Sequence, residues 1–249
     1  MTRRTMSQAQ IVSAAIELLD EEGLDGLSMR RLGQRLGSAA TAVYWHVQSK
    51  ETLVALASDQ TWGEISVLEP GEVGWRRAAV ALARSTYDLG VTHHWLIPAI
   101  PSCLAYGTGM ARYQDHSYAI FEAAGFTGAD LDWAVNTLFT FVIGTAYQDS
   151  AQARLLTSQK DNKAVQHRLQ EAAGNAEQIV AQFPRLQARA AQQAQWNAEP
   201  HTTRIEALEF GLDVILDGMS VRLNKDLAAN NRSRQEGDGT RDNAFNSAP

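Results

Sequence analysis

Apolar residues recur along most of this chain with the three- and four-residue spacing of an amphipathic helix. Near the N-terminus, one such stripe is formed by Ile11, Ala14, Ala15, Leu18 and Leu19. These positions fall on one side of a helix with about 3.6 residues per turn, and Gly23 follows as a helix stop. The alternating pattern of a half-buried strand is essentially absent, so the sequence predicts an all-α protein.

The next part of the chain predicts three more helices close together. Ser28 can cap the short second helix of the chain, and Gly37 then breaks it. The third helix is also short and covers about 40–46. Ser49 can cap the fourth helix, which is expected to run from about 50 to 67.

Beyond a turn-rich linker at 68–74, the helical spacing continues toward the C-terminus. The segments expected to be helical are 74–93, 96–103, 108–124, 128–155, 164–182 and 203–224. Between 151 and 199, Ala, Gln and Asn replace large apolar residues, which predicts a partly mobile helix-loop-helix excursion. The polar, glycine-containing segment 225–249 is expected to be disordered.

Composition narrows the class of protein. The chain has 249 residues, 45% of them hydrophobic, and a formal net charge of −6, which argues against a general polyanion binder. A single cysteine, Cys103, excludes an intramolecular disulfide and favours a reducing compartment. No stretch approaches the roughly 18 apolar residues needed to cross a bilayer. We therefore expect a soluble cytoplasmic protein.

The chain as a whole is negatively charged, but the segment from Gly26 to Lys50 is positively charged. No Asp or Glu occurs between Gly26 and Lys50, and this stretch carries Arg30, Arg31, Arg35 and Lys50. The nearest acids lie on the first helix and its exit. Short helices joined by a glycine turn, in a basic segment that lacks acids, are typical of a helix-turn-helix on DNA. On charge alone, a merely solvated basic face remains the alternative.

The apolar pattern of the third helix supports a DNA-reading role. Val43 and Val47 are four residues apart and can pack inward against the helix before them. Tyr44, Trp45 and His46 then cannot all be core, because three consecutive helical residues span most of a turn. Tyrosine and histidine side chains are good phosphate partners, and so are the free N–H groups at a helix start.

These residues resemble the TetR family of transcriptional repressors. The runs that carry the resemblance are IVSAAIELLDEEGLDGLSMRRLGQRLG and TAVYWHVQSKETLVALA, and the Tyr-Trp-His-Val run is close to that of the tetracycline repressors. The match is dense over about 7–62. FEAAGF and FGLDVILDGMSVRL extend it weakly into the C-terminal region.

The resemblance assigns DNA contacts position by position, to Met29, Arg30, Ala40, Thr41, Ala42, Tyr44, Trp45, His46 and Lys50. Arg30 would reach a guanine edge with Met29 alongside it. Tyr44, His46 and Lys50 would hold phosphates. The alanines at the tip of the reading helix can only touch thymine methyl groups or allow close approach, which leaves Arg30 and Thr41 as the main polar readers. Trp45 has two open roles, shielding the interface or packing against the fourth helix.

The resemblance also implies a homodimer and a ligand pocket in the C-terminal region. The dimerisation helices would contain Leu131–Tyr147 and Ile205–Leu223, where small residues would allow close approach. The pocket candidates are aromatic and polar side chains suited to a flat hydrophobic molecule. They are Trp95, Tyr106, Tyr113, His116, Tyr118, Trp133, Asn136, Phe139 and Tyr147.

The sequence gives little indication of a metal site, a cofactor site or an enzyme active site. Tetracycline repressors bind a drug–magnesium chelate with a pocket histidine, whereas this chain has IPAIPSC and Ser66 at the corresponding points. We therefore expect no metal site and no cofactor. The sequence has no nucleophile elbow or glycine-rich phosphate loop, which argues against an enzyme.

The sequence thus predicts a ligand-responsive repressor that binds a palindromic operator as a homodimer. Residues 1–67 form a helix-turn-helix DNA-binding domain with a connecting helix from about 50, 68–224 form a larger helical ligand-binding and dimerisation domain, and 225–249 form a disordered tail. The expected partners are double-stranded DNA, a second copy of the chain and a small-molecule effector, with no membrane. An activator or a ligand-independent regulator of the same architecture remains the alternative.

Overall fold

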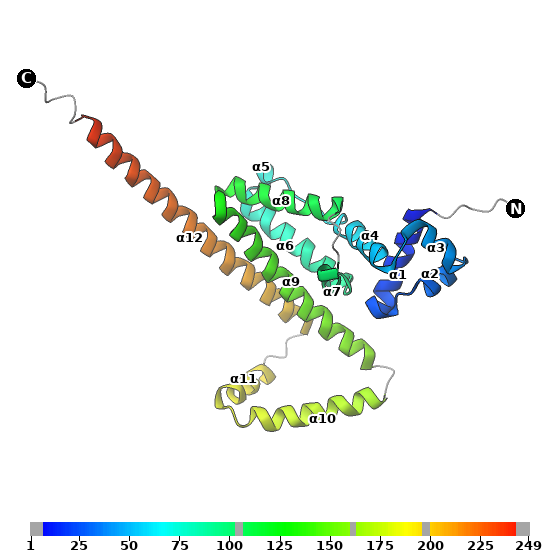
Figure 1. Ribbon diagram of the computed structural model, residues 1–249. Coiled ribbons are helices and arrows are strands. Elements are labelled where there is room, and N and C mark those ends of the chain that lie inside the picture. Colours follow the sequence, from blue (N-terminus) through cyan, green and yellow to red (C-terminus); the bar gives the residue numbers. More distant parts are fainter. Residues whose placement is uncertain (1–6, 103–106, 160–162, 196–199, 243–249) are drawn as a thin grey trace, which may run out of the picture.

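The computed structural model describes residues 7–102, 107–159, 163–195 and 200–242 (Figure 1). Within these ranges the chain is helical and contains no strand, which confirms the predicted fold class. Cys103 and the pocket candidate Tyr106 lie outside the described residues. The elements are α1 (Gln8–Gly26), α2 (Met29–Arg35), α3 (Ala40–Val47), α4 (Lys50–Trp62), α5 (Pro70–Val73), α6 (Trp75–Thr92), α7 (Leu96–Ala99), η1 (Ile100–Ser102), α8 (Thr108–Ala124), α9 (Gly128–Gln159), α10 (Lys163–Val180), α11 (Pro184–Gln195) and α12 (Pro200–Asp242).

The second and fourth helices, α2 and α4, begin at the serine caps that the sequence predicts. The hydroxyl oxygens of Ser28 and Ser49 accept hydrogen bonds from the backbone N–H groups of Arg31 and Thr52, which caps α2 and α4. Gly23 leaves the helical conformation with φ 72° and kinks α1 before its last turn. Because each signal acts within a few residues, the sequence alone was enough to locate these boundaries.

The turn between α2 and α3 depends on close backbone approach. A Cβ on Gly33 would lie 2.8 Å from the carbonyl oxygen of Ser38 and 3.1 Å from the backbone nitrogen of Ala40, so only glycine lets α3 start here. Val43 and Val47 are buried as predicted, and they share one core cluster with Leu32 of α2. The reading unit, defined here as α2 and α3, is therefore held as one rigid pair.

The helix that leaves the N-terminal domain is shorter than predicted. The expected helix 50–67 ends at Trp62, because the C-terminal Gly63 leads into an extended segment over 65–69. Helix α8 fixes this segment, since Arg112 donates from Nη2 to the carbonyls of Gly63 and Ile65 at 3.1 and 3.0 Å. The predicted turn-rich linker contains one short helix, α5.

Helices α4 and α8 also meet directly. Oδ1 of Asp59 accepts hydrogen bonds from the backbone N–H of Gly109 at 2.7 Å and from that of Met110 at 3.3 Å, so an α4 carboxylate caps the start of α8. The approach is close enough that a Cβ on Gly109 would overlap the carbonyl oxygen of Asp59. Helix α4 is thus anchored to the C-terminal domain by the Asp59 carboxylate and by close backbone contact with α8.

The body of the C-terminal domain is formed by α6, α8, α9 and α12. Helix α6 packs against α8 and α9, and α12 runs antiparallel beside α9 (Figure 1). One buried polar link ties three of these helices: Tyr87 of α6 donates to Asp149 of α9 at 2.6 Å, and Arg204 of α12 lies 3.4 Å from the same carboxylate. Burial and the Asp149 carboxylate raise the pKa of Tyr87, so this hydroxyl stays protonated.

The C-terminal half agrees with one expectation and departs from another. The segment between α9 and α12 forms two helices, α10 and α11, which lead away from the body before α12 returns, as the predicted helix-loop-helix excursion does (Figure 1). Helix α12 continues to Asp242, so the prediction of disorder from 225 is wrong as far as that residue; between 225 and 236 there is neither proline nor glycine to stop it.

No helix among the described residues is long and apolar enough to span a membrane.

Candidate nucleic-acid interface

The face of α3 opposite the core is exposed and carries the predicted polar and aromatic groups. Thr41, Tyr44, Trp45 and His46 are all exposed, whereas Val43 and Val47 point inward. This division follows from the helical period, because the two valines occupy one side of the α3 turn. The structure therefore brings the aromatic residues of α3 onto one open surface.

Trp45 is the most exposed large apolar side chain of this surface, with 88% of its area accessible, compared with 48% for Tyr44. The alternative that Trp45 packs against α4 is thereby excluded in this structure. A tryptophan side chain left in water loses the stabilisation that burial of its large apolar area would provide. Together with the exposed ring of Tyr44 it forms a small aromatic patch, which makes this surface a candidate contact with another molecule.

Helix α2 exposes Arg30 but buries Met29. Met29 is 6% exposed and belongs to the N-terminal core, so the expectation that it lies alongside a base is wrong. The reason is periodicity, since Met29 shares the inner side of α2 with Leu32. Arg30 is exposed and makes no ion pair with any described residue.

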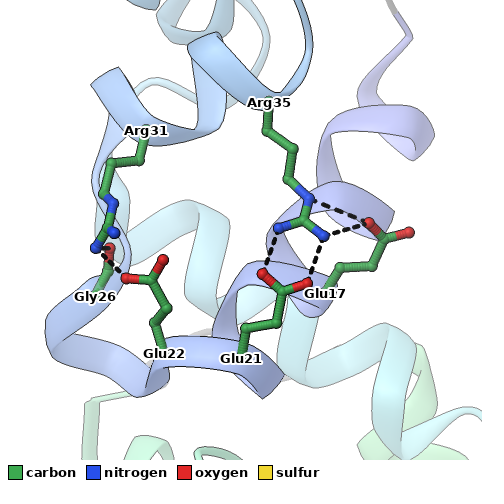
Figure 2. Close-up of polar contacts among 6 residues, drawn as sticks. All are labelled: Glu17, Glu21, Glu22, Gly26, Arg31 and Arg35. Carbon is green, nitrogen blue, oxygen red and sulfur yellow. Dashed lines mark hydrogen bonds and ion pairs between the residues drawn. The ribbon is translucent and has the colours of Figure 1, made fainter.

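The other two arginines of α2 are held by α1 (Figure 2). Arg35 grips Glu21 through two parallel hydrogen bonds of 2.6 and 2.7 Å, and its Nη2 lies 3.2 Å from the Glu17 carboxylate. Hydrogen bonding to Arg35 lowers the pKa of Glu21. Arg31 pairs with Glu22 and also donates to the Gly26 carbonyl at 3.3 Å. We call these contacts the α1–α2 clasp.

The clasp corrects the charge pattern inferred from the sequence. The acids of α1 and the bases of α2 were expected to be segregated, with the bases facing DNA. Instead, three carboxylates of α1 neutralise Arg31 and Arg35. Arg30 is therefore the α2 arginine that remains available to a polyanion.

Lys50 likewise has a structural partner. Its ammonium group donates to the carbonyl oxygen of Leu24 at 2.8 Å, which ties the start of α4 to the end of α1. In this conformation Lys50 does not project toward the α3 surface. The local sequence pattern around Lys50 could not predict this bond, because Leu24 lies 26 residues earlier in the chain.

One exposed residue of α2 was not among the candidates. Gln34 lies four residues after Arg30, so both occupy one flank of α2. Gly33 between them touches the start of α3. The i, i+4 spacing from Arg30 was the signal that could have indicated Gln34, since glutamine is a good partner for an adenine edge.

Comparison with known proteins places this architecture in a family. Residues 69–223 match the family model for the tetracyclin repressor-like C-terminal domain. The chain belongs to the TetR family. Residues 11–57 match the model for bacterial regulatory proteins of the tetR family, so the N-terminal helices are its DNA-binding domain. TetR proteins are transcriptional regulators, and this chain is one of them.

Individual relatives agree with this assignment. A helix-turn-helix transcriptional regulator of Saccharopolyspora erythraea is 34% identical over 149 residues, which cover 60% of this chain and 63% of that protein, less than two thirds of its length. The class A tetracycline repressor of Escherichia coli is 29% identical over 85% of this chain and 89% of its own. The TetR protein ActR of Streptomyces coelicolor, solved with actinorhodin, superposes with a TM-score of 0.66 at 23% identity, over 88% of this chain and 98% of that one.

The ligand candidates of this TetR protein do not converge on one pocket. Tyr113 is buried, with its ring centroid 5.1 Å from that of Trp62 and 5.8 Å from that of Phe139, so these three rings form an aromatic cluster between α4, α8 and α9. Burial raises the pKa of Tyr113. His116 lies 3.0 Å from the carbonyl oxygen of Leu68 and so holds the segment 63–69 between α4 and α5, which we call the connector.

The remaining candidates lie elsewhere in this TetR structure. Trp95 is buried against α1 and does not line the aromatic cluster. Trp133, Asn136 and Tyr147 are exposed on the outer side of α9, and the partly exposed Tyr118 donates to Asp132 at the start of that helix. A groove of about 340 Å³ passes between α9 and α12 beside Trp133. No group of three potential metal-ligating side chains occurs within the described ranges.

Proposed function

We propose that this TetR protein is a repressor that binds a palindromic operator as a homodimer and is released by a flat, hydrophobic aromatic ligand. The observation that carries the proposal is the open surface of the helix-turn-helix, where α3 exposes a tryptophan to 88% and α2 exposes an arginine without an ion pair among the described residues. The family assignment supports a ligand-responsive DNA-binding regulator in general. The operator, the dimer and the ligand are our inference.

In this proposal the reading unit divides the work between bases and phosphates. Arg30 donates two hydrogen bonds to a guanine, and Thr41 is the polar reader of the α3 tip. Tyr44 and His46 donate to phosphates, and Trp45 covers the sugar–phosphate backbone beside them. Lys50 contributes by fixing α4 to α1, because its ammonium group is already bonded there.

The proposal is tested with the DNA upstream of the protein's own gene. Fluorescence anisotropy should show a complex that competitor DNA does not displace and whose affinity falls as salt rises, because phosphate contacts release counterions. The same fragment in scrambled order is the control. Equal affinity for the natural and the scrambled fragment would contradict specific operator binding.

The alanine tip predicts a specific dependence on thymine methyl groups. Replacing thymine by uracil at base pairs beneath Ala40 and Ala42 is expected to weaken binding about fourfold per contacted methyl, the value of one buried methyl group. Uracil placed outside the protected region is the matched control. Unchanged affinity at every position beneath α3 would exclude methyl contacts.

The proposed dimer interface is the outer face of α9 and α12. Several large apolar side chains on these two helices are at least half exposed to solvent. They are Trp133, Tyr147, Phe210, Val214 and Val221. Nothing stands within 4 Å of a Cβ built on Gly144 or Gly218, so these positions leave room for a second helix pair. Gly211 instead faces the ring of Phe141 inside the protomer. An open apolar face of this size favours a second copy of the same face.

Phe210→Glu is expected to break this dimer. Phe210 is 73% exposed in the single chain, and a carboxylate buried there without a partner should raise the dimer dissociation constant roughly 100-fold. Sedimentation velocity measures the change. Leu186→Glu, at a 54% exposed leucine of α11, is the matched control and should remain dimeric. A Phe210→Glu protein that stays as dimeric as this control would place the interface elsewhere.

The proposed ligand site is the aromatic cluster of Trp62, Tyr113 and Phe139. Apolar rings with a single phenolic hydroxyl suit a flat aromatic molecule that stacks and accepts one hydrogen bond. ActR, which shares the fold, was solved with actinorhodin, and that supports the class of ligand. Release requires that the ligand bind more tightly to the conformation whose reading units do not match the operator.

A further inference from the structure

A carboxylate of α1 joins the DNA-binding domain to the C-terminal domain. Oδ1 of Asp20 accepts a hydrogen bond from Nε1 of Trp95 at 2.7 Å and lies 2.8 Å from Nδ1 of His93. Both partners are buried, Trp95 at 1% exposure and His93 at 8%. They stand where α6 ends and α7 begins, more than 70 residues from Asp20 along the chain. We call this contact the Asp20 joint.

The joint also includes the segment that follows α4. Nε2 of His93 lies 3.5 Å from the carboxylate of Glu64, so the imidazole stands between one acid of α1 and one acid of the connector. The edge of the His93 ring packs against Trp95, with ring centroids 6.3 Å apart. Hydrogen bonds to an ionised carboxylate are about twice as strong as neutral ones and are strongly directional. The joint therefore fixes the orientation of α1 as well as its position.

The same helix carries the α1–α2 clasp on neighbouring turns. Glu17 and Glu21 flank Asp20 in sequence and hold Arg35, and Glu22 holds Arg31 (Figure 2). The end of α6 and helix α2 are thus both bonded to the same two turns of α1. Because α2 and α3 are one rigid pair at Gly33, a movement of α1 carries the DNA-reading surface with it.

We propose that Asp20 is a positioning residue through which the α6–α7 segment sets the angle of the reading unit. The proposal rests on the proposed function, because it names the route by which that function is regulated. Helix α4 is held at its C-terminal end, by Asp59 at the start of α8 and by Arg112 at the carbonyls of Gly63 and Ile65. The Asp20 joint adds a separate contact through α1, which limits rotation of the reading domain about α4. A ligand that moves the end of α6 then turns the reading unit through α1.

The test measures the separation of the two reading units in the full-length homodimer without DNA. Spin labels are attached at Thr41→Cys in a Cys103→Ser background, which removes the only native cysteine. Asp20→Ala removes the acceptor of the joint, and Trp95→Phe removes its indole donor while keeping an aromatic ring. Asp25→Ala is the matched control, because Asp25 is an exposed acid of the same helix.

Pulsed dipolar spectroscopy should give one narrow distance for the parent and the Asp25→Ala protein, and a broad distribution for Asp20→Ala and Trp95→Phe. Hydrogen exchange adds a readout that needs no dimer: the amides of α2 should exchange at least about fivefold faster in both joint variants. Unchanged distances and unchanged α2 exchange in Trp95→Phe would overturn the proposal even if Asp20→Ala failed to fold. Equal changes in Asp25→Ala would overturn it as well.

The two proposals fail separately in this experiment. A parent protein without a dipolar signal contradicts the proposed homodimer, and the exchange rates of α2 then decide the joint. A dimeric, unlabelled wild-type protein that binds no DNA contradicts operator binding, while the distance distributions still decide whether Asp20 positions the reading units.

Discussion

Replacing Arg30 with alanine is expected to weaken operator binding about 1,000-fold. One arginine with two hydrogen bonds to a guanine contributes roughly 1–3 kcal/mol of discrimination, and a two-fold dimer uses it twice, which gives about 4 kcal/mol. Arg30 is free to make this contact because it has no ion pair among the described residues. Anisotropy titration against the operator duplex measures the loss, and preference for guanine at that position should disappear with it.

Arg31→Ala is the matched control for this prediction. It removes the same charge from the next position of the same helix, but Arg31 is already neutralised by Glu22. We expect a loss of less than about tenfold, without a change in base preference. If both variants lost affinity equally and kept their base preference, Arg30 would act only as a charge, and the proposed base contact would be wrong.

Replacing Gly109 with alanine is expected to lower the free energy of unfolding by about 3 kcal/mol. The added Cβ would overlap the carbonyl oxygen of Asp59 and would also lie 2.8 Å from the backbone nitrogen of Gly63. Backbone atoms cannot move aside as a side chain tip can, so α8 must shift away from α4. Thermal unfolding should show a midpoint lower by about 9 °C, since each kcal/mol moves a chain of this size by a few degrees.

The control for Gly109→Ala is Gly174→Ala in α10. Nothing lies within 4 Å of a Cβ at Gly174, so alanine there should stabilise the helix by about 0.5 kcal/mol through its better helix propensity. The same substitution is thus expected to have opposite signs at two helical positions. A Gly109→Ala protein as stable as the wild type would show that α4 and α8 are not in close contact.

The local features of the DNA-binding domain could be predicted from the sequence. The caps at Ser28 and Ser49 and the inward pair Val43 and Val47 each depend on residues within one or two turns. For the same reason the helical period predicted that Tyr44, Trp45 and His46 cannot all be core, while the role of Trp45 stayed open. Met29 was misplaced because a resemblance assigns a position, whereas its burial follows from the side of α2 that it shares with Leu32.

The electrostatics of the site could not be predicted in the same way. Arg35 and its partners Glu17 and Glu21 are separated by 18 and 14 residues, and whether they meet depends on how α1 and α2 cross. Trp95 was assigned to the ligand pocket as one of several aromatic side chains of the C-terminal region. Only the fold shows that Asp20 approaches its indole, 75 residues away in the chain. Long-range contacts of this kind leave no periodic pattern in the sequence.

The central claim is that two reading units of a homodimer, each built from α2 and α3, grip one palindromic operator. Hydroxyl-radical footprinting of the operator by the full-length protein tests it most directly. The account predicts two protected patches on one face of the duplex, about one helical turn or ~34 Å apart, with symmetric ends. A single protected patch, or protection that no sequence change abolishes, would contradict it.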